Sequence, residues 1–218
     1  MELANARVAV LVENLYQELE LWYPVLRLRE AGVQVVLVGP KAGEAYASKI
    51  GYPAIAEAGF DDVAASDFDA VIVPGGFSPE YLRRNPSAVK FVQDLDARGA
   101  TVAAICHAGW LLSTAKILQG RNVTSVPVIR DDVANAGGLW QDRAVVVDCN
   151  LITAQLHNDL PEFTRRVLDA LEKSEGGGRL TAEPAIHASA RYSASAVVKN
   201  RAAAPGSANY RAYAVLES

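Results

Sequence analysis

The sequence predicts an α/β fold in which helices cover a mostly parallel β-sheet. Short runs of β-branched and other apolar residues alternate with longer segments of helical period, which is the pattern of βαβ units. The 218 residues suffice for one sizeable domain with an appendage, and 50% hydrophobic with 21% charged residues excludes a disordered chain. We therefore expect an α/β sandwich built around one central sheet.

The N-terminal part of the chain predicts the first crossover. Residues 7–12 form an apolar run of strand length, and residues 18–31 carry apolar side chains at helical spacing. This helix is expected to stop at Gly32, because glycine commonly follows the last helical residue. Residues 33–39 predict the second strand, and residues 40–51, which show little periodicity, predict a loop or a short hairpin.

The same alternation continues through the rest of the domain. Residues 69–73 form a strand-length run that ends in Pro-Gly-Gly, and the apolar run at 100–105 is typical of a central strand covered on both faces. Helices are expected at 86–98, 107–118 and 160–173, and two further strands at 144–147 and 151–154.

The pattern changes after residue 174, which predicts two parts. Residues 1–174 form the α/β domain, and residues 175–218 form an Ala- and Ser-rich C-terminal extension. Apolar and polar residues alternate within 186–198 and again within 210–216. The extension is either a β-hairpin arm or a mostly irregular tail.

Composition and charge exclude several classes of partner. A net charge of −4 argues against a surface that neutralises phosphates, so we expect no nucleic-acid partner. The apolar runs are far shorter than the roughly 18 residues of a membrane span. Glu2 stands where a secretory signal carries Lys or Arg, so we expect a cytoplasmic protein that binds no membrane.

Cys106 is the strongest chemical feature, because it lies where the predicted strand meets the next helix. A thiol at a helix N-terminus has its pKa lowered from about 8.5 by the helix dipole and unpaired N–H groups. We expect a thiolate nucleophile in a turn like the nucleophile elbow of hydrolases, with an inert buried cysteine as the alternative. His107 is either a base for the thiol or a helix cap. The second cysteine, Cys149, is expected to be reduced.

Other candidates follow neighbouring strands at the same edge of the sheet, outside the carboxyl ends where ligands bind in parallel sheets. Gly75 and Gly76 either direct N–H groups at an anion or simply end a strand. Glu18 and Glu20 begin the first helix and are either solvated or functional. A carboxyl group held near Cys106 would tend to be protonated and to donate a hydrogen bond to the thiolate. No His/Cys cluster has zinc-ligand spacing, so no metal site is predicted.

Several short motifs extend over residues 7–171. They are Glu18-Leu19-Glu20-Leu21-Trp22-Tyr23-Pro24, Lys49-Ile50-Gly51-Tyr52, Pro74-Gly75-Gly76 with Pro79-Glu80, Ala104-Ile105-Cys106-His107, Ile129-Arg130-Asp131-Asp132 with Asn135-Ala136-Gly137, and Asp159-Leu160-Pro161. This set resembles the ThiJ/PfpI superfamily, and within it the PfpI-type intracellular cysteine peptidases, deglycase-like proteins and general stress proteins. The resemblance implies a flavodoxin-like three-layer sandwich with a mostly parallel central sheet, related to class I glutamine amidotransferase domains.

The resemblance also implies roles for the candidate residues. Cys106 matches the elbow nucleophile, and Glu20 matches the glutamate that hydrogen-bonds it. Gly76 and the amide of His107 match the oxyanion hole, and Gly75 is expected to belong to it as well.

The same resemblance implies an oligomer. In PfpI-type members a glutamate that matches Glu80 reaches the histidine that matches His107 from a neighbouring subunit. A homodimer, or a hexamer built from dimers, would therefore complete the site.

The substrate pocket is expected to include Gln17, Lys49 and Val126. Gln17 and Val126 depart from the family pattern, which often has a glutamate and a tyrosine there. Ile50 replaces a common histidine, and Gln155 a usual arginine. These departures remove polar pocket groups while Cys106, Glu20 and His107 remain, so they leave the nucleophile in place and the substrate range open.

The activities implied by the resemblance are a cofactor-independent glyoxalase or deglycase acting on small reactive carbonyls, with weak peptidase activity. The Cys106 thiolate would attack the carbonyl carbon while Glu20 moves the proton, and no cofactor is required. One alternative is a non-catalytic, redox-sensing stress-response protein in which Cys106 is oxidised and stabilised by Glu20. A glutaminase-type amidotransferase is disfavoured, because His157 and His187 have no following acidic partner at short spacing.

Overall fold

A computed structural model of the chain describes residues 2–173. The boundary predicted at residue 174 and the arm predicted within 175–218 lie outside the described residues. Within residues 2–173, no helix is both long and apolar enough to cross a membrane.

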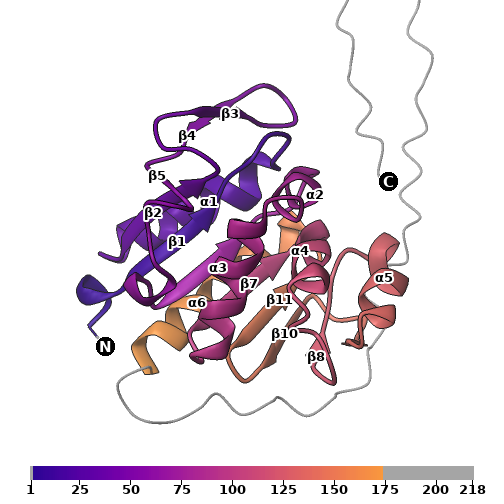
Figure 1. The fold of residues 1–218 in the computed structure, drawn as a ribbon. Coiled ribbons are helices and arrows are strands. Elements are labelled where there is room, and N and C mark those ends of the chain that lie inside the picture. Colours follow the sequence, from indigo (N-terminus) through magenta and orange to yellow (C-terminus); the bar gives the residue numbers. More distant parts are fainter. Residues whose placement is uncertain (1, 174–218) are drawn as a thin grey trace, which may run out of the picture. The chain divides into compact units, whose positions relative to one another are not determined.

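The centre of the molecule is a seven-stranded sheet with the order β10-β11-β7-β6-β1-β2-β5 (Figure 1). Neighbouring strands are parallel except for β10 and β11, which form an antiparallel edge pair. The strands are β1 (Arg7–Leu11), β2 (Gln34–Gly39), β5 (Ala58–Gly59), β6 (Ala70–Val73), β7 (Thr101–Ile105), β10 (Val145–Asp148) and β11 (Leu151–Ala154).

Helices cover both faces of this sheet. On one face α1 (Glu18–Glu30) packs against α6 (Leu160–Lys173), and on the other α3 (Pro86–Ala97) packs against α4 (Gly109–Thr114) (Figure 1). Two short helices, α2 (Ser78–Leu82) and α5 (Arg130–Asn135), contact α4. The predicted α/β class and its flavodoxin-like three-layer arrangement are confirmed.

Short elements complete the described part of the chain. Two small sheets pair β3 (Ala45–Ala47) with β4 (Pro53–Ile55) and β8 (Asn122–Val123) with β9 (Leu139–Trp140). The 3-10 turns are η1 (Leu3–Asn5), η2 (Ala65–Asp67), η3 (Cys106–Ala108), η4 (Pro127–Ile129) and η5 (His157–Asp159).

The central strands are apolar because both of their faces are covered. Every residue of β6 and β7 is buried, as the uninterrupted apolar runs predicted. The helices α1, α3 and α6 begin and end within two residues of their predicted bounds. The short α2 and α5 were missed, since five or six residues do not display a helical period.

The prediction of a helix at 107–118 is wrong at both ends. The chain first makes the 3-10 turn η3, and α4 begins only at Gly109. The helix ends at Thr114, before Lys116 takes a left-handed conformation with a φ of 57°. Cys106 therefore precedes the α-helix by a full turn.

The strand order reverses direction beside β1, at the edge of the sheet where the carboxyl ends of β1, β6 and β7 lie. From β1 the chain runs outward to β2 and β5 and then returns to β6 on the opposite side of β1. The loops after β1 and β6 diverge at this reversal, and such a point is where open parallel sheets bind ligands. The candidate residues follow β1, β6 and β7.

Candidate active site

Cys106 directly follows β7 in a strained backbone conformation. Its φ is 62°, in a region that non-glycine residues seldom occupy, and its side chain is 9% exposed. The left-handed conformation turns the chain sharply between β7 and α4. This is the strand-to-helix elbow that the sequence predicted for Cys106.

Gly75 brings the β6 loop against both Glu20 and Cys106. The N–H of Gly75 donates a hydrogen bond of 2.8 Å to Oε2 of Glu20. A Cβ atom on Gly75 would lie 2.5 Å from that oxygen and 2.6 Å from Cβ of Cys106. Only glycine fits between these two side chains without displacing one of them.

Glu20 is held in the interior, at the start of α1. It is 1% exposed, and its N–H donates a 2.8 Å hydrogen bond to the side chain of Gln17, the N-cap of the helix. Burial raises the pKa of Glu20 to about 7, against the opposing effects of the Gly75 N–H and the Cys106 side chain. Near neutral pH this carboxyl group can therefore hold or release a proton.

The pKa of Cys106 differs from the sequence-based expectation. Burial and the neighbouring Glu20 carboxylate raise the pKa of the thiol, whereas a lowered value was predicted from a helix N-terminus. The prediction was wrong because η3 separates Cys106 from α4 and because the sulfur lies in the interior. Because each group raises or lowers the pKa of the other, Cys106 and Glu20 lose their protons as a coupled pair rather than independently.

His107 places a neutral imidazole beside the sulfur. Its Nδ1 lies 3.3 Å from Sγ of Cys106, and its ring lies 4.9 Å from that of Trp110. Burial, followed by the charge of Lys49, lowers the pKa of His107, so the ring is uncharged at neutral pH and able to accept a proton.

Two backbone N–H groups, those of Gly76 and His107, donate hydrogen bonds to the Cys106 sulfur. Such donors stabilise negative charge on sulfur or on an oxygen bound nearby. Gly75 was also expected in this oxyanion hole, but its N–H donates to Glu20 instead. The two glycines therefore have different roles: Gly75 positions the acid, and Gly76 faces the nucleophile.

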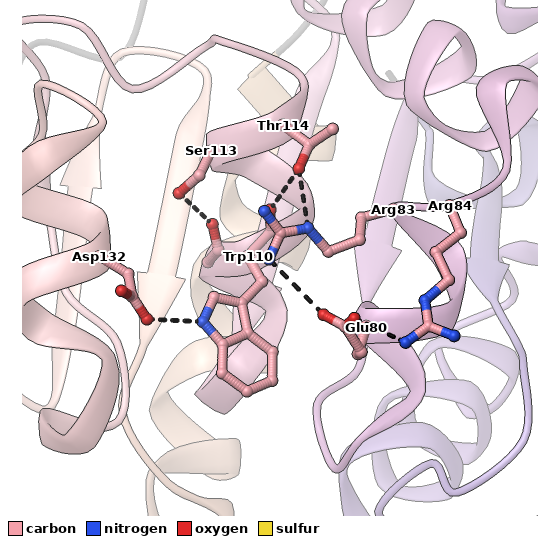
Figure 2. A network of polar contacts seen from close by, with 8 residues as sticks. Glu80, Arg83, Arg84, Trp110, Ser113, Thr114 and Asp132 are labelled. Atoms are coloured by element: carbon pink, nitrogen blue, oxygen red, sulfur yellow. Dashed lines mark hydrogen bonds and ion pairs between the residues drawn. The ribbon is translucent and has the colours of Figure 1, made fainter.

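Glu80 lies in a surface network of its own chain. Its carboxylate pairs with Arg84 at 2.8 Å and with Arg83 at 3.6 Å (Figure 2). Arg83 also donates to Thr114 on α4 at 2.9 Å. The approach of Glu80 to His107 across a subunit contact stays a prediction.

The three expected pocket residues occupy different environments. The side chain of Gln17 caps α1, which makes it a positioning residue for Glu20. Val126 is buried, and its N–H donates to the carbonyl oxygen of Cys106 at 3.3 Å. Lys49 is exposed, and its N–H donates to the carbonyl oxygen of Tyr16 at 3.0 Å.

Sequence reasoning missed Tyr16, which joins the parts of the site. Tyr16 pairs with Ser48 on one side and with Gly76 on the other, and its hydroxyl donates to the carbonyl oxygen of Tyr52 at 2.7 Å. Isolated bridges leave no periodic signal in a sequence. Among residues 2–173 no group of three or more His, Cys, Asp or Glu side chains is arranged to hold a metal ion.

The family model described as DJ-1/PfpI matches residues 6–170, which includes every strand of the sheet and each residue of the site. The chain belongs to the DJ-1/PfpI family. The expected resemblance to the PfpI-type branch is thereby confirmed.

Relatives extend over nearly the same residues. Protein/nucleic acid deglycase 2 of Escherichia coli is 37% identical over 169 residues, which cover 77% of this chain and 98% of that protein. General stress protein 18 of Bacillus subtilis is also 37% identical over 169 residues, with the same coverage.

A solved structure shares the fold. It is a two-domain protein from Anabaena variabilis with DJ-1/ThiJ/PfpI-like and ferritin-like domains, and it aligns with a TM-score of 0.76 and 38% identity. The match covers 77% of this chain and 48% of the Anabaena chain, so this chain spans about half the length of that protein.

Proposed function

We propose that the chain is a cysteine-dependent enzyme of the deglycase or glyoxalase type, which acts on small reactive carbonyl compounds without a cofactor. The observation that carries the proposal is the environment of one sulfur atom. Cys106 contacts a buried acid with a pKa of about 7 and two N–H donors. These are the parts that a thiol needs to add to a carbonyl group.

The addition step follows from the shared proton. When the proton of the pair resides on Glu20, the Cys106 thiolate adds to the aldehyde carbon, and an S–C bond forms as the C=O π bond breaks. The resulting oxyanion accepts hydrogen bonds from the N–H groups of Gly76 and His107, and Glu20 then supplies its proton. The raised pKa of the thiol does not prevent this step, because the thiol transfers its proton to the neighbouring Glu20 carboxylate rather than to water.

A 2-oxoaldehyde is then converted by an internal redox step. His107, neutral and 3.3 Å from the sulfur, moves the proton of the former aldehyde carbon to the adjacent carbonyl carbon. Water then cleaves the thioester and regenerates the thiol. For methylglyoxal the product is lactate: the aldehyde carbon is oxidised, the ketone carbon is reduced, and one water molecule is consumed.

Burial of the nucleophile favours small substrates over polypeptides. Cys106 is 9% exposed and Glu20 is 1% exposed, so a backbone amide would have to pass below the protein surface to reach the sulfur. The E. coli relative, named a protein/nucleic acid deglycase, supports the carbonyl class of substrate. Peptidase activity is at most a weak side reaction.

Methylglyoxal consumption and lactate release, measured without glutathione, test the proposal. Cys106→Ala should abolish turnover. Cys149→Ala is the matched control, because Cys149 also has a positive φ, of 54°, and is a free thiol, yet it lies in the β10–β11 turn. Equal rates for the two variants would contradict the proposal. A Cys106 that gains oxygen under mild peroxide in a protein that turns over no carbonyl would assign the redox-sensing role instead.

A further inference from the structure

Lys49 lies in a segment that borders the site through backbone pairing. Ser48 pairs with Tyr16, and Tyr16 pairs with Gly76, so three segments lie side by side at the edge of the sheet. The N–H of Lys49 donates to the carbonyl oxygen of Tyr16 at 3.0 Å. Two strand spacings, roughly 10 Å, thus separate this segment from Gly76, and the long lysine side chain can span most of that gap.

The backbone on both sides of Lys49 is fixed. The N–H of Ile50 donates to Oε1 of Glu18 at 2.9 Å, which ties the segment to the first turn of α1. The hydroxyl of Ser48 accepts a 2.8 Å hydrogen bond from the N–H of Tyr52. The segment therefore holds Lys49 at a constant place relative to the start of α1.

The charge of Lys49 affects the pKa values of two residues beside Cys106. After burial, it is the second cause that lowers the pKa of His107, and it opposes the rise that burial produces in the pKa of Glu20. The side chain itself is exposed, and it forms no ion pair with any residue of 2–173. The nearby Glu18 carboxylate accepts the Ile50 N–H, and the charge of Lys49 is one of the effects that lower the pKa of Glu18.

We infer that Lys49 is a specificity residue, whose ammonium group binds a negatively charged group of the substrate while Cys106 adds to its carbonyl carbon. This inference rests on the proposed function and narrows it: preferred substrates carry an anionic group near the reactive aldehyde. Glu20 holds the proton when the Cys106 thiolate forms, so the carboxyl group beside the sulfur does not repel an incoming anion, and Lys49 supplies a positive charge that attracts it.

Alkylation of Cys106 tests the charge of Lys49 without any turnover. Iodoacetate and iodoacetamide both form an S–C bond and release iodide, but only iodoacetate is anionic. Lys49→Gln should lower the ratio of the iodoacetate rate to the iodoacetamide rate by about fivefold, the factor that opposite unit charges ~4 Å apart in water produce. A change common to both reagents reports the altered pKa values of Glu20 and His107 and cancels in this ratio. The rate is read at the Cys106 peptide by mass spectrometry, which separates it from Cys149.

Two variants complete the alkylation test. Lys49→Arg should restore the ratio of the two rates, because it retains the charge. Lys90→Gln is the matched control: it removes the same charge from α3, where Lys90 pairs with Asp94 at 2.8 Å. Equal slowing of both reagents by Lys49→Gln, or no slowing of either, would overturn the inference.

Turnover of two arylglyoxals then links the charge to specificity. Wild-type protein should prefer 4-carboxyphenylglyoxal over phenylglyoxal, and Lys49→Gln should lower this preference, measured as the ratio of the two kcat/KM values, by about fivefold. A protein that turns over neither compound would refute the proposed function, and the alkylation ratio would still decide the role of Lys49. A preference that survives in Lys49→Gln would overturn the inference.

Discussion

Glu20→Gln is expected to remove a pH dependence of stability that the wild-type protein carries. Glutamine keeps the shape of the side chain and a carbonyl oxygen for the Gly75 N–H, which is 2.8 Å from the carboxylate. It cannot titrate. The substitution therefore isolates the free energy that is linked to the proton of Glu20.

The sign and size of the effect follow from the pKa of Glu20, which burial raises from 4.5 to about 7. Between these values the folded protein keeps a proton that the unfolded chain has lost, so the free energy of unfolding falls as the pH rises. At ~1.4 kcal/mol per pH unit, the wild-type protein loses about 3 kcal/mol relative to Glu20→Gln between pH 4.5 and 7. Below and above this window the difference is constant.

Urea unfolding of both proteins under reducing conditions, at intervals from pH 4 to 8.5, measures this difference. Glu18→Gln is the control with the opposite sign. Although burial raises the pKa of Glu18, hydrogen bonds from Ser48 and Ile50 lower it overall, so Glu18 stabilises the fold more as the pH rises. A free-energy difference between wild type and Glu20→Gln that does not change with pH would refute the reasoning.

Three further substitutions test the construction of the site and the core. Gly75→Ala places a Cβ atom 2.5 Å from the Glu20 carboxylate and 2.6 Å from Cβ of Cys106, so it should lower the free energy of unfolding by ~1–3 kcal/mol and abolish turnover. Gln17→Ala removes the N-cap of α1, so urea unfolding should show a loss of about 1 kcal/mol, with lower kcat because Glu20 is less well positioned. Phe163→Ala empties a fully buried position on α6 and should cost about 4 kcal/mol in urea unfolding, without changing the pH profile of alkylation at Cys106.

The fold was largely predictable because its signals are local. The apolar runs that became β6 and β7 lie within single stretches of sequence, and so does the periodic face of α6. The start of α4 was not predictable in this way. The left-handed φ of Cys106 and the 3-10 turn after it depend on how β7 packs against the loops around it.

The sequence indicated several residues that the structure brings together, among them Glu20, Gly75 and Cys106, but not the contacts between them. Gly75 and Glu20 are 55 positions apart, and no local pattern indicates that the amide of one donates to the carboxylate of the other. The predicted direction of the Cys106 pKa shift was wrong for the same reason. A sequence shows that a helix follows Cys106, whereas the dominant effect on the pKa is burial beside Glu20. Long-range contacts therefore assign Gly75 to positioning and leave Gly76 and His107 as donors to the sulfur.

The rate of iodoacetamide alkylation at Cys106 as a function of pH, compared between wild type and Glu20→Gln, tests most directly that these two residues share one proton. The wild-type rate should rise through an apparent pKa near 7, as the pair loses its first proton, and Glu20→Gln should show a rise only at higher pH. A step near pH 7 that persists in Glu20→Gln would contradict the shared proton, and with it the way the thiolate is formed.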